Sequence, residues 1–387
     1  DVDEDSSTLT VVFSDEDGVP LGSPEPSSDS VELTVGPFEA VGAYTFQLEV
    51  EDSQGETCTA GVTFEIGSDG VADYLEGEPY DSVAYHSAET DIDKDRVLVY
   101  GGQQYHQLSD GLNAYNLTDD AWSTVAAAGA DPGERMGHAT AMDNLNNKMY
   151  MFGGQMYHHL SDELMVFDTV TDTWSYPETD PYSGSRPPPL TGASMVIDED
   201  GGKLYIFGGQ GYHGLNDELW TYDIASDAWN DVPYSSSEGP VGAGMVAGFD
   251  PSAVGEGIRP GIVFGGQTYH QLMNSGWCFD ATGFSPLTFT TGDELPPTVG
   301  MAGAWASNYG GIVAFGGQTY YQLLDDAYLI RVVGDCEVEV ALLDESSGAP
   351  PPVVGGAMAW SPADAEAFLV GGQTYYELSD RVTGIKP

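Results

Sequence analysis

The feature that most constrains this chain is a Gly-Gly pair that ends an apolar run and recurs six times. The second glycines of the pairs are Gly102, Gly154, Gly209, Gly266, Gly317 and Gly372, at intervals of 52, 55, 57, 51 and 55 residues. Recurrence at such a period is typical of an architecture that stacks one supersecondary unit many times. The sequence therefore predicts six copies of one unit.

A polar motif follows each pair at constant offsets. Gln comes one residue after the second glycine, Tyr three after, His or Tyr four after, Leu six after, and Asp or Asn eight after. The candidate binding residues are Gln103, Tyr105, His106, Gln155, Tyr157, His158, Gln210, Tyr212, His213, Gln267, Tyr269, His270, Gln318, Tyr320, Tyr321, Gln373, Tyr375 and Tyr376.

Each unit has the pattern of four short strands. In the second unit we expect them at residues 137–142, 148–152, 163–168 and 172–176, with turn residues between them. Helical periodicity is absent, and four strands in about fifty residues are typical of a propeller blade. The predicted fold is all-β.

The repeat resembles the kelch repeat. The matching features are the double glycine after an apolar strand, an aromatic-Asp pair such as Phe167-Asp168, and a Trp six residues beyond that Asp, as at Trp174 and Trp229. The resemblance covers about residues 80–387 and implies a six-bladed kelch-like β-propeller. Later copies depart from it: Phe284 replaces the Trp in the fourth, and Asp335-Cys336-Glu337 stands there in the fifth.

The sixth copy ends at Pro387, in its third strand. An unpaired strand edge is a liability. We therefore expect residues 71–75, within a linker over 68–79, to supply the missing outer strand and close the ring.

Residues 1–67 have a different pattern, with alternating strands predicted at 9–13, 31–35, 44–50 and 59–66. The run Gly42–Ile66 resembles the terminal hairpin of bacterial PKD or Ig-like repeats, which implies a small β-sandwich of the kind that serves as a spacer on surface proteins. The usual first strand is not found, so either the sandwich is incomplete or Asp1 is a processed end within a longer chain.

Charge excludes several partners. Lys+Arg 10 against Asp+Glu 62 gives a net charge of −52, whereas phosphate binding needs a basic face, so nucleic acid and anionic lipid are not expected. No run approaches eighteen apolar residues, so no membrane span is expected. Alternating carboxylates at residues 1–5 and 91–95 offer weak sites for calcium, and no other cofactor is expected.

The three cysteines are Cys58, Cys278 and Cys336, and they have no metal-type spacing. The sequence does not decide whether Cys278 and Cys336 form a disulfide.

In a propeller, every copy of one loop lies on the same face. The six Gln-x-Tyr-His loops would then form a rim of amide and aromatic groups suited to a peptide or a sugar. The alternative is structural: the tyrosines pack between blades, and the glutamines pair with backbone groups left open by the double glycine.

These residues favour a non-catalytic binding, adhesion or assembly protein, exported to the cell surface or outside it, with filament membership included. Catalysis needs distinct residues in distinct roles, whereas the six loops are nearly alike. The enzymatic alternative rests on kelch-like sugar enzymes. An oxidase of that kind would need a Cys beside a ligand Tyr, and a mutarotase a charged pair, for which Glu134-Arg135 and Arg186 are candidates.

Overall fold

The structure, a computed structural model, describes residues 83–177, 186–233, 239–253, 258–343 and 350–387, together with the backbone of five earlier strands. The chain divides into two compact units, Asp1–Asp69 and Gly70–Pro387. No helix among the described residues is long and apolar enough to cross a membrane.

The first unit contains one antiparallel sheet in the order β2-β1-β3-β4. Its strands are β1 Thr10–Ser14, β2 Pro20–Gly22, β3 Gly42–Glu51 and β4 Thr57–Ile66. Three of the four predicted strands correspond to β1, β3 and β4, and the fourth, at 31–35, lies outside the described residues. These strands form a single sheet, so the Ig- or PKD-like sandwich is not shown and stays a prediction.

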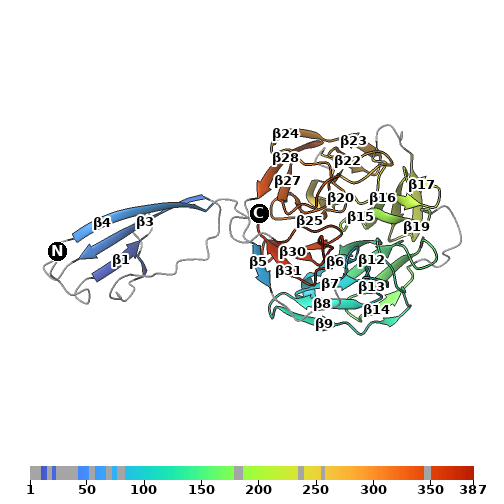
Figure 1. Cartoon of the computed structure of the whole chain (residues 1–387), viewed down its shortest axis with the longest axis horizontal. Coiled ribbons are helices and arrows are strands. Elements are labelled where there is room, and N and C mark those ends of the chain that lie inside the picture. Colours follow the sequence, from blue (N-terminus) through green and yellow to red (C-terminus); the bar gives the residue numbers. More distant parts are fainter. Residues whose placement is uncertain are drawn as a thin grey trace. The chain divides into compact units, whose positions relative to one another are not determined.

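The strands of the second unit form six sheets arranged around a central axis (Figure 1). From the innermost strand outward, the first three blades are β6 Ser87–Asp91, β7 Arg96–Tyr100, β8 Leu112–Asn116, β9 Ala121–Thr124; β11 Ala139–Asp143, β12 Lys148–Phe152, β13 Leu164–Asp168, β14 Thr173–Ser175; and β15 Thr191–Asp198, β16 Lys203–Gly211, β18 Leu219–Asp223, β19 Ala228–Val232.

The other three blades are β20 Val246–Phe249, β21 Gly261–Phe264, β22 Gly276–Asp280, β23 Gly283–Pro286; β25 Ala302–Ala306, β26 Gly311–Phe315, β27 Ala327–Gly334, β28 Glu337–Leu343; and β29 Ala357–Ser361, β30 Glu366–Val370, β31 Val382–Ile385, β5 Ala72–Leu75. Short strands β10 Ala128–Gly129, β17 Gly214–Leu215 and β24 Thr288–Gly292 pair with β14, β16 and β28. Single 3-10 turns, Ile92–Lys94 and Pro251–Ala253, follow β6 and β20.

Blade six takes its outer strand from before blade one. β5 pairs antiparallel with β31, so that Leu75 faces Val382 and Ala72 faces Ile385. Figure 1 shows this blue strand beside the red C-terminal strands. β5 lies within the segment for which the sequence predicts this place, and its pairing joins the two ends of the propeller.

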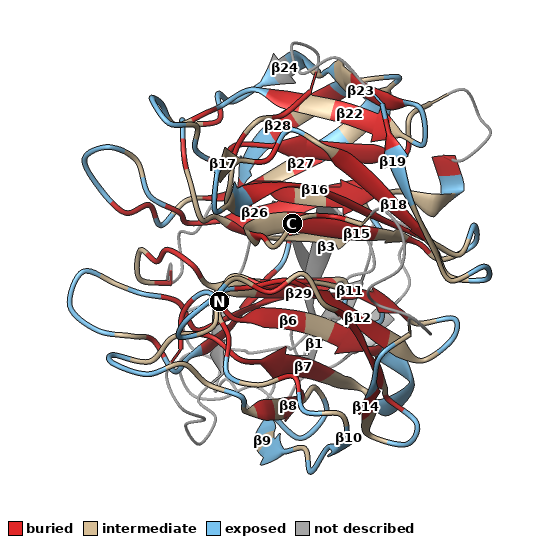
Figure 2. Ribbon diagram, turned by 90° about the vertical axis from the view of Figure 1, so that its right-hand side faces the viewer, coloured by how far each residue is buried: buried red, intermediate tan, exposed pale blue. Residues whose placement is uncertain are grey.

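The kelch aromatic positions pack neighbouring blades together. Trp174 lies 5.1 Å from Phe167 of its own blade and 5.3 Å from Tyr100, the residue before the double glycine of the preceding blade, between ring centroids. Trp229 and Phe284 make the same two kinds of contact, with Tyr222 and Phe152, and with Phe279 and Phe207. Buried residues accordingly run along the strands while exposed residues gather in the turns (Figure 2). Phe284 therefore makes the same inter-blade packing contacts as the Trp residues at the equivalent position of blades two and three.

Each double glycine joins its blade to the next. The amide of the second glycine donates to a carbonyl of the segment that leads into the following blade, from Gly102 to Arg135 at 2.8 Å through to Gly372 and Val83 at 2.9 Å. Both glycines of each pair have positive φ. A Cβ on Gly154 would lie 2.9 Å from the Cβ of His138, so no larger residue fits without displacement.

A second ring of hydrogen bonds encircles the axis. We call its six residues the central collar: Tyr85, Gly137, Gly192, Gly244, Gly300 and Gly355. Each backbone amide donates to the carbonyl of the preceding member at 2.6–3.3 Å, and Tyr85 closes the ring by donating to Gly355. All six have φ between 58° and 68°, a left-handed conformation that favours glycine.

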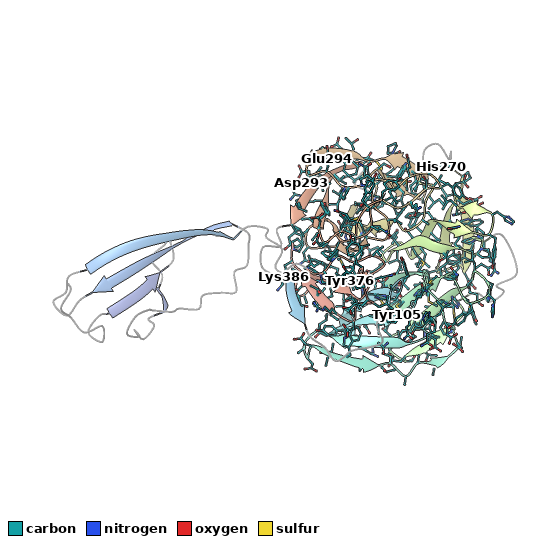
Figure 3. The ribbon with its side chains drawn as sticks, in the orientation of Figure 1. Tyr105, His270, Asp293, Glu294, Tyr376 and Lys386 are labelled. Carbon is teal, nitrogen blue, oxygen red and sulfur yellow. A yellow bond between two sulfur atoms is a disulfide. The ribbon has the colours of Figure 1, made fainter. Side chains whose placement is uncertain are left out.

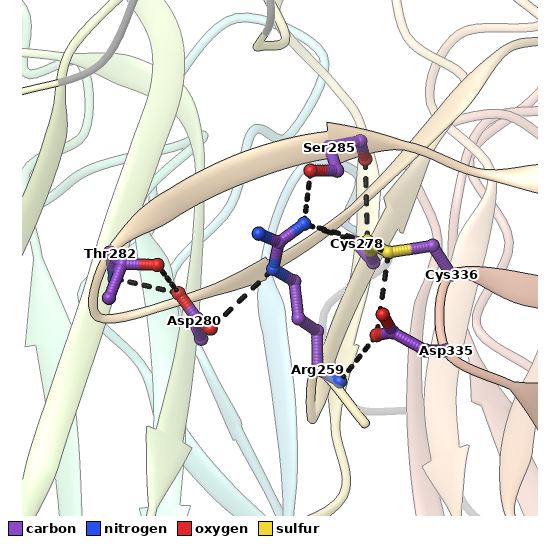
Figure 4. Close-up of a disulfide and its surroundings, with 7 residues drawn as sticks. All are labelled: Arg259, Cys278, Asp280, Thr282, Ser285, Asp335 and Cys336. Atoms are coloured by element: carbon purple, nitrogen blue, oxygen red, sulfur yellow. Dashed lines mark hydrogen bonds and ion pairs between the residues drawn. A yellow bond between two sulfur atoms is a disulfide. The ribbon is translucent and has the colours of Figure 1, made fainter. Parts of the chain in front are cut away.

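A disulfide links blades four and five where the aromatic contact is missing (Figure 4). Cys278 on β22 is bonded to Cys336, which lies in the turn between β27 and β28, with a Cα–Cα distance of 5.2 Å. The guanidinium of Arg259 lies over the bridge, contacts Ser285, and is 3.5 Å from Asp280. The disulfide that the sequence did not decide is therefore formed.

Candidate functional site

The six repeated loops lie at one end of the blades. The backbone of each Gln bridges the segment that leads into its own blade, as Gln103 does with Ala84, and also bridges the repeated Leu of its own loop, as with Leu108. The loops between the second and third strands therefore share an end with the segments between blades. We call this end the loop face.

The repeated tyrosines connect each loop to the one before it. The hydroxyl of Tyr157 accepts the amide of Leu108 at 2.9 Å, and the pattern continues with Tyr212, Tyr269, Tyr320 and Tyr375 on Leu160, Leu215, Leu272 and Leu323 at 2.5–2.7 Å. Tyr105 completes the circle by accepting the amide of Leu378, which belongs to the loop that also carries Tyr376 (Tyr105 and Tyr376 are labelled in Figure 3). These tyrosines thus hold the loops in place, although more than half of each side chain is exposed.

The side chains one residue further on make no such hydrogen bond to a neighbouring loop among the described residues. His106, His158, His213 and His270 are exposed, and Tyr321 and Tyr376 are 95% exposed. Where a ring contact exists, it is with the neighbouring loop tyrosine, as between Tyr375 and Tyr376 at 6.4 Å. The fourth position therefore presents aromatic groups to solvent at all six places.

The repeated glutamines satisfy backbone groups with their own backbone and not with their side chains. Gln103 donates to and accepts from Ala84 at 2.8 and 3.1 Å. Within the described part of the chain, the amide side chains of the six glutamines have no hydrogen-bond partner. They are exposed except for Gln103, which is half-buried. The side chains are left available to a ligand.

Small hydroxyl residues that the sequence did not single out shape the loops. Ser109 accepts the amide of Gly111 at 3.1 Å, and Ser161 and Ser379 act alike in their blades. In blade four, Thr268 accepts two amides of its own loop. The three serines stand seven residues after the second glycine of their pairs, and this recurrence is the signal that could have identified them.

The loop face surrounds a central cavity of about 530 Å³. It is lined by collar residues, by the apolar side chains of Met136, Val299 and Val354, and by the side chains of Gln210, Gln267 and Gln318. None of its lining residues carries a charge at neutral pH. In a chain with a net charge of −52, this is a neutral patch.

A second cavity of about 460 Å³ lies at the other end of the inner strands. Glu89 lines it and accepts a hydrogen bond from the hydroxyl of Thr140 at 2.8 Å. Burial raises the pKa of Glu89 to about 7, against the lowering effect of hydrogen bonds from Thr140 and the Met142 amide, and the charge of Glu199 adds to the rise. Among the described residues, no Lys or Arg forms an ion pair with this carboxyl.

Of the pair considered for an enzyme, Glu134 is exposed but Arg135 is not presented to a ligand. Arg135 is fully buried, where its guanidinium donates to the carbonyl of Gly153 at 2.9 Å and to that of Pro132. Arg186 pairs with Asp162 at 2.6 Å. The oxidase alternative would need a Cys beside a loop tyrosine, whereas Cys278 and Cys336 are bonded to each other.

The buried histidines belong to the core. His86 and His138 lie at matching places beside the first strands of blades one and two, and burial lowers the pKa of His86 to about 4 and that of His138 to about 3. His138 contacts the hydroxyl of Ser87 at 3.0 Å. Neutral packing groups explain both positions.

No group of three or more His, Cys, Asp or Glu residues suited to a metal occurs in the portion of the chain that is described. In the Asp-rich segment at 91–95, Asp91 is paired with Arg96 at 2.8 Å. The other, at 1–5, lies outside the described residues. Calcium binding stays a prediction.

Six blades with the double glycine, the loop motif and the inter-blade aromatic residues define a kelch-type β-propeller. A family model described as the KLHDC2/KLHL20/DRC7 Kelch-repeats domain matches residues 76–249. The chain therefore contains a kelch-repeat domain.

Three curated proteins illustrate what the propeller is similar to. Kelch repeat-containing protein 2 of Saccharomyces cerevisiae is 30% identical over 141 residues, which are 33% of this chain and 15% of the yeast protein. Rab9 effector protein with kelch motifs of Mus musculus is 36% identical over 126 residues, 32% of each chain. N-(sulfonatooxy)prop-2-enimidothioate sulfolyase of Thlaspi arvense is 28% identical over 243 residues, 58% of this chain and 67% of the plant protein.

Proposed function

We propose that the loop face of the propeller binds a partner protein. The observation that carries this proposal is the set of six exposed aromatic side chains at the fourth loop position, held on loops that the Tyr-to-Leu hydrogen bonds join into a ring. Loops that are already ordered lose little entropy on binding. Aromatic groups supply large contact area and are enriched at interface hot spots.

Two further observations support a protein partner. Kelch-propeller relatives suggest a protein-binding role, and the mouse relative is named as an effector of Rab9. The net charge of −52 favours a partner with basic residues around the contact, because opposite charges accelerate association.

We also propose that the protein works outside the cell or at its surface. The disulfide between blades four and five supports this location, since such bridges persist in oxidising compartments. Adhesion and assembly into a filament are the roles we infer for an exported protein of this kind.

A displayed library of random peptides, each closed into a loop by a disulfide, tests the binding face. The library is selected on the full chain, and the affinity of the selected peptides is measured by fluorescence anisotropy. Replacing Tyr321 and Tyr376 together by Ala should weaken binding at least tenfold. Both side chains are 95% exposed, and each makes a ring contact with the neighbouring loop tyrosine, so folding should be unaffected.

The matched control lies at the opposite end of the blades. Leu145 and Val170 are exposed in the turns after β11 and β13, and their replacement by Ala should leave affinity within twofold. Equal effects of both pairs, or none from the tyrosines, would refute the proposal. A glycan bound on an array, and lost with the tyrosine pair alone, would make carbohydrate the partner instead.

A further inference from the structure

One member of the central collar departs from the sixfold pattern. Five members are glycines with φ of 60–68°, and the sixth is Tyr85, with φ of 58°. An L-residue in this region crowds its Cβ against the following carbonyl, which is why the other five positions hold glycine. The fold requires the conformation, but it does not require a tyrosine.

The tyrosine side chain points toward the collar glycine of blade six. A Cβ built on Gly355 would lie 2.7 Å from Cε1 of the Tyr85 ring. The ring thus rests against the backbone of Gly355, in space that only the absence of a side chain there leaves free.

The hydroxyl of Tyr85 is not used within the propeller. The hydroxyls of the repeated loop tyrosines accept backbone amides, whereas that of Tyr85 has no hydrogen-bond partner among the described residues. Its side chain is 39% exposed and lines the central cavity. A strained residue whose polar group is unpaired at the mouth of a cavity points to a ligand.

The cavity determines what could meet this ring. The amides of Gln210, Gln267 and Gln318 supply donors and acceptors, and the apolar side chains described above complete the wall. A charged group would be desolvated here without a counter-charge, which is unfavourable. An uncharged segment of polypeptide fits, because its amides pair with the glutamines and an apolar side chain covers the aromatic ring.

We propose that Tyr85 anchors the partner: the uncharged tip of a loop of the partner protein enters the central cavity and lays an apolar side chain against the Tyr85 ring. This rests on the proposed function, because it names what the loop face receives at its centre. The exposed Asp110 and Asp217 on the surrounding loops would face basic residues that flank the tip. Tyr85 is the one collar residue whose side chain can make the six similar loops act as an asymmetric site.

The selected loop peptides provide the probe. Tyr85→Gly restores the residue found at the other five collar positions, so the variant should fold with unchanged or higher resistance to urea. It should bind the peptides at least tenfold more weakly than the unaltered chain. Tyr85→Asn, which tolerates a positive φ, is the second variant and should lose affinity to the same extent. Replacing the apolar tip residue of a peptide by Asp should weaken binding, and replacing it by Lys should do the same.

The outcomes separate the two proposals. If the Tyr321 and Tyr376 pair weakens binding while both Tyr85 variants bind within twofold of the unaltered chain, the loop face binds but Tyr85 is not its anchor. If neither the Tyr321 and Tyr376 pair nor the Tyr85 variants change the affinity, both proposals fail. Loss of urea resistance in both Tyr85 variants without loss of affinity would show that Tyr85 is a packing residue and overturn the inference.

Discussion

Glu89 should make the propeller less stable as the pH rises through neutrality. Its side chain is half-buried at the wall of a cavity. Its carboxyl accepts a hydrogen bond from Thr140, and burial raises its pKa to about 7 from an ordinary value of 4.5. The folded state therefore holds the proton more tightly than the unfolded chain between these two values. The free energy of unfolding consequently falls from about pH 4.5 to about pH 7.

The size of the effect follows from the two pKa values. The difference of 7 − 4.5 corresponds to about 3 kcal/mol at a pH above both. This is an upper limit, since Glu89 lines a cavity that water can enter. Glu89→Gln removes the ionisation and keeps an oxygen that can accept the same hydrogen bonds. We expect this variant to match the parent at pH 5 and to exceed its stability by about 1–3 kcal/mol at pH 8.5.

The stability difference between the parent and Glu89→Gln is measured by urea unfolding at pH 5 and pH 8.5 without added salt, followed by tryptophan fluorescence. Glu337→Gln is the matched control, because Glu337 is exposed on β28, and it should change stability equally at the two pH values. A difference between parent and Glu89→Gln that is the same at pH 5 and pH 8.5 would refute the reasoning.

Three other perturbations have defined outcomes. Reducing the Cys278–Cys336 bridge, which closes a separation of 58 residues, should lower stability by about 4 kcal/mol on the chain-entropy model; an unmoved urea midpoint after verified reduction contradicts this. Arg135→Ala removes a buried guanidinium and its carbonyl contacts and should cost about 3 kcal/mol in thermal unfolding, whereas an unchanged melting temperature would place the residue outside the framework. Tyr212→Phe should speed hydrogen exchange at the Leu160 amide about fivefold and leave global stability nearly unchanged; equal exchange rates would refute the bond.

Much of the propeller could be predicted because the sequence patterns that specify its strands and turns are local and repeated. The strands expected at 148–152 and 163–168 agree with β12 and β13 to within a residue. A double glycine after an apolar strand marks a place where only positive φ fits, and this requirement is visible at each of the six positions.

The candidate site was predicted only in part. The offset pattern identified which residues recur, but a repeated tyrosine is equally consistent with packing and with binding. The structure shows a structural contact for one tyrosine of the loop: the hydroxyl of Tyr375 accepts the Leu323 amide of the preceding loop, while Tyr376 is exposed. Neighbours in sequence differ in role here because their partners come from another blade.

The sequence by itself determined the number of blades, the end of each blade that carries the motif, and the net charge of the chain, since periodicity and charge are properties of the chain alone. Only the tertiary structure decided that Cys278 meets Cys336, that Arg135 is buried, and that Tyr85 occupies a glycine's place in the collar. These facts depend on contacts between residues far apart in the chain, which exist only once the ring has closed.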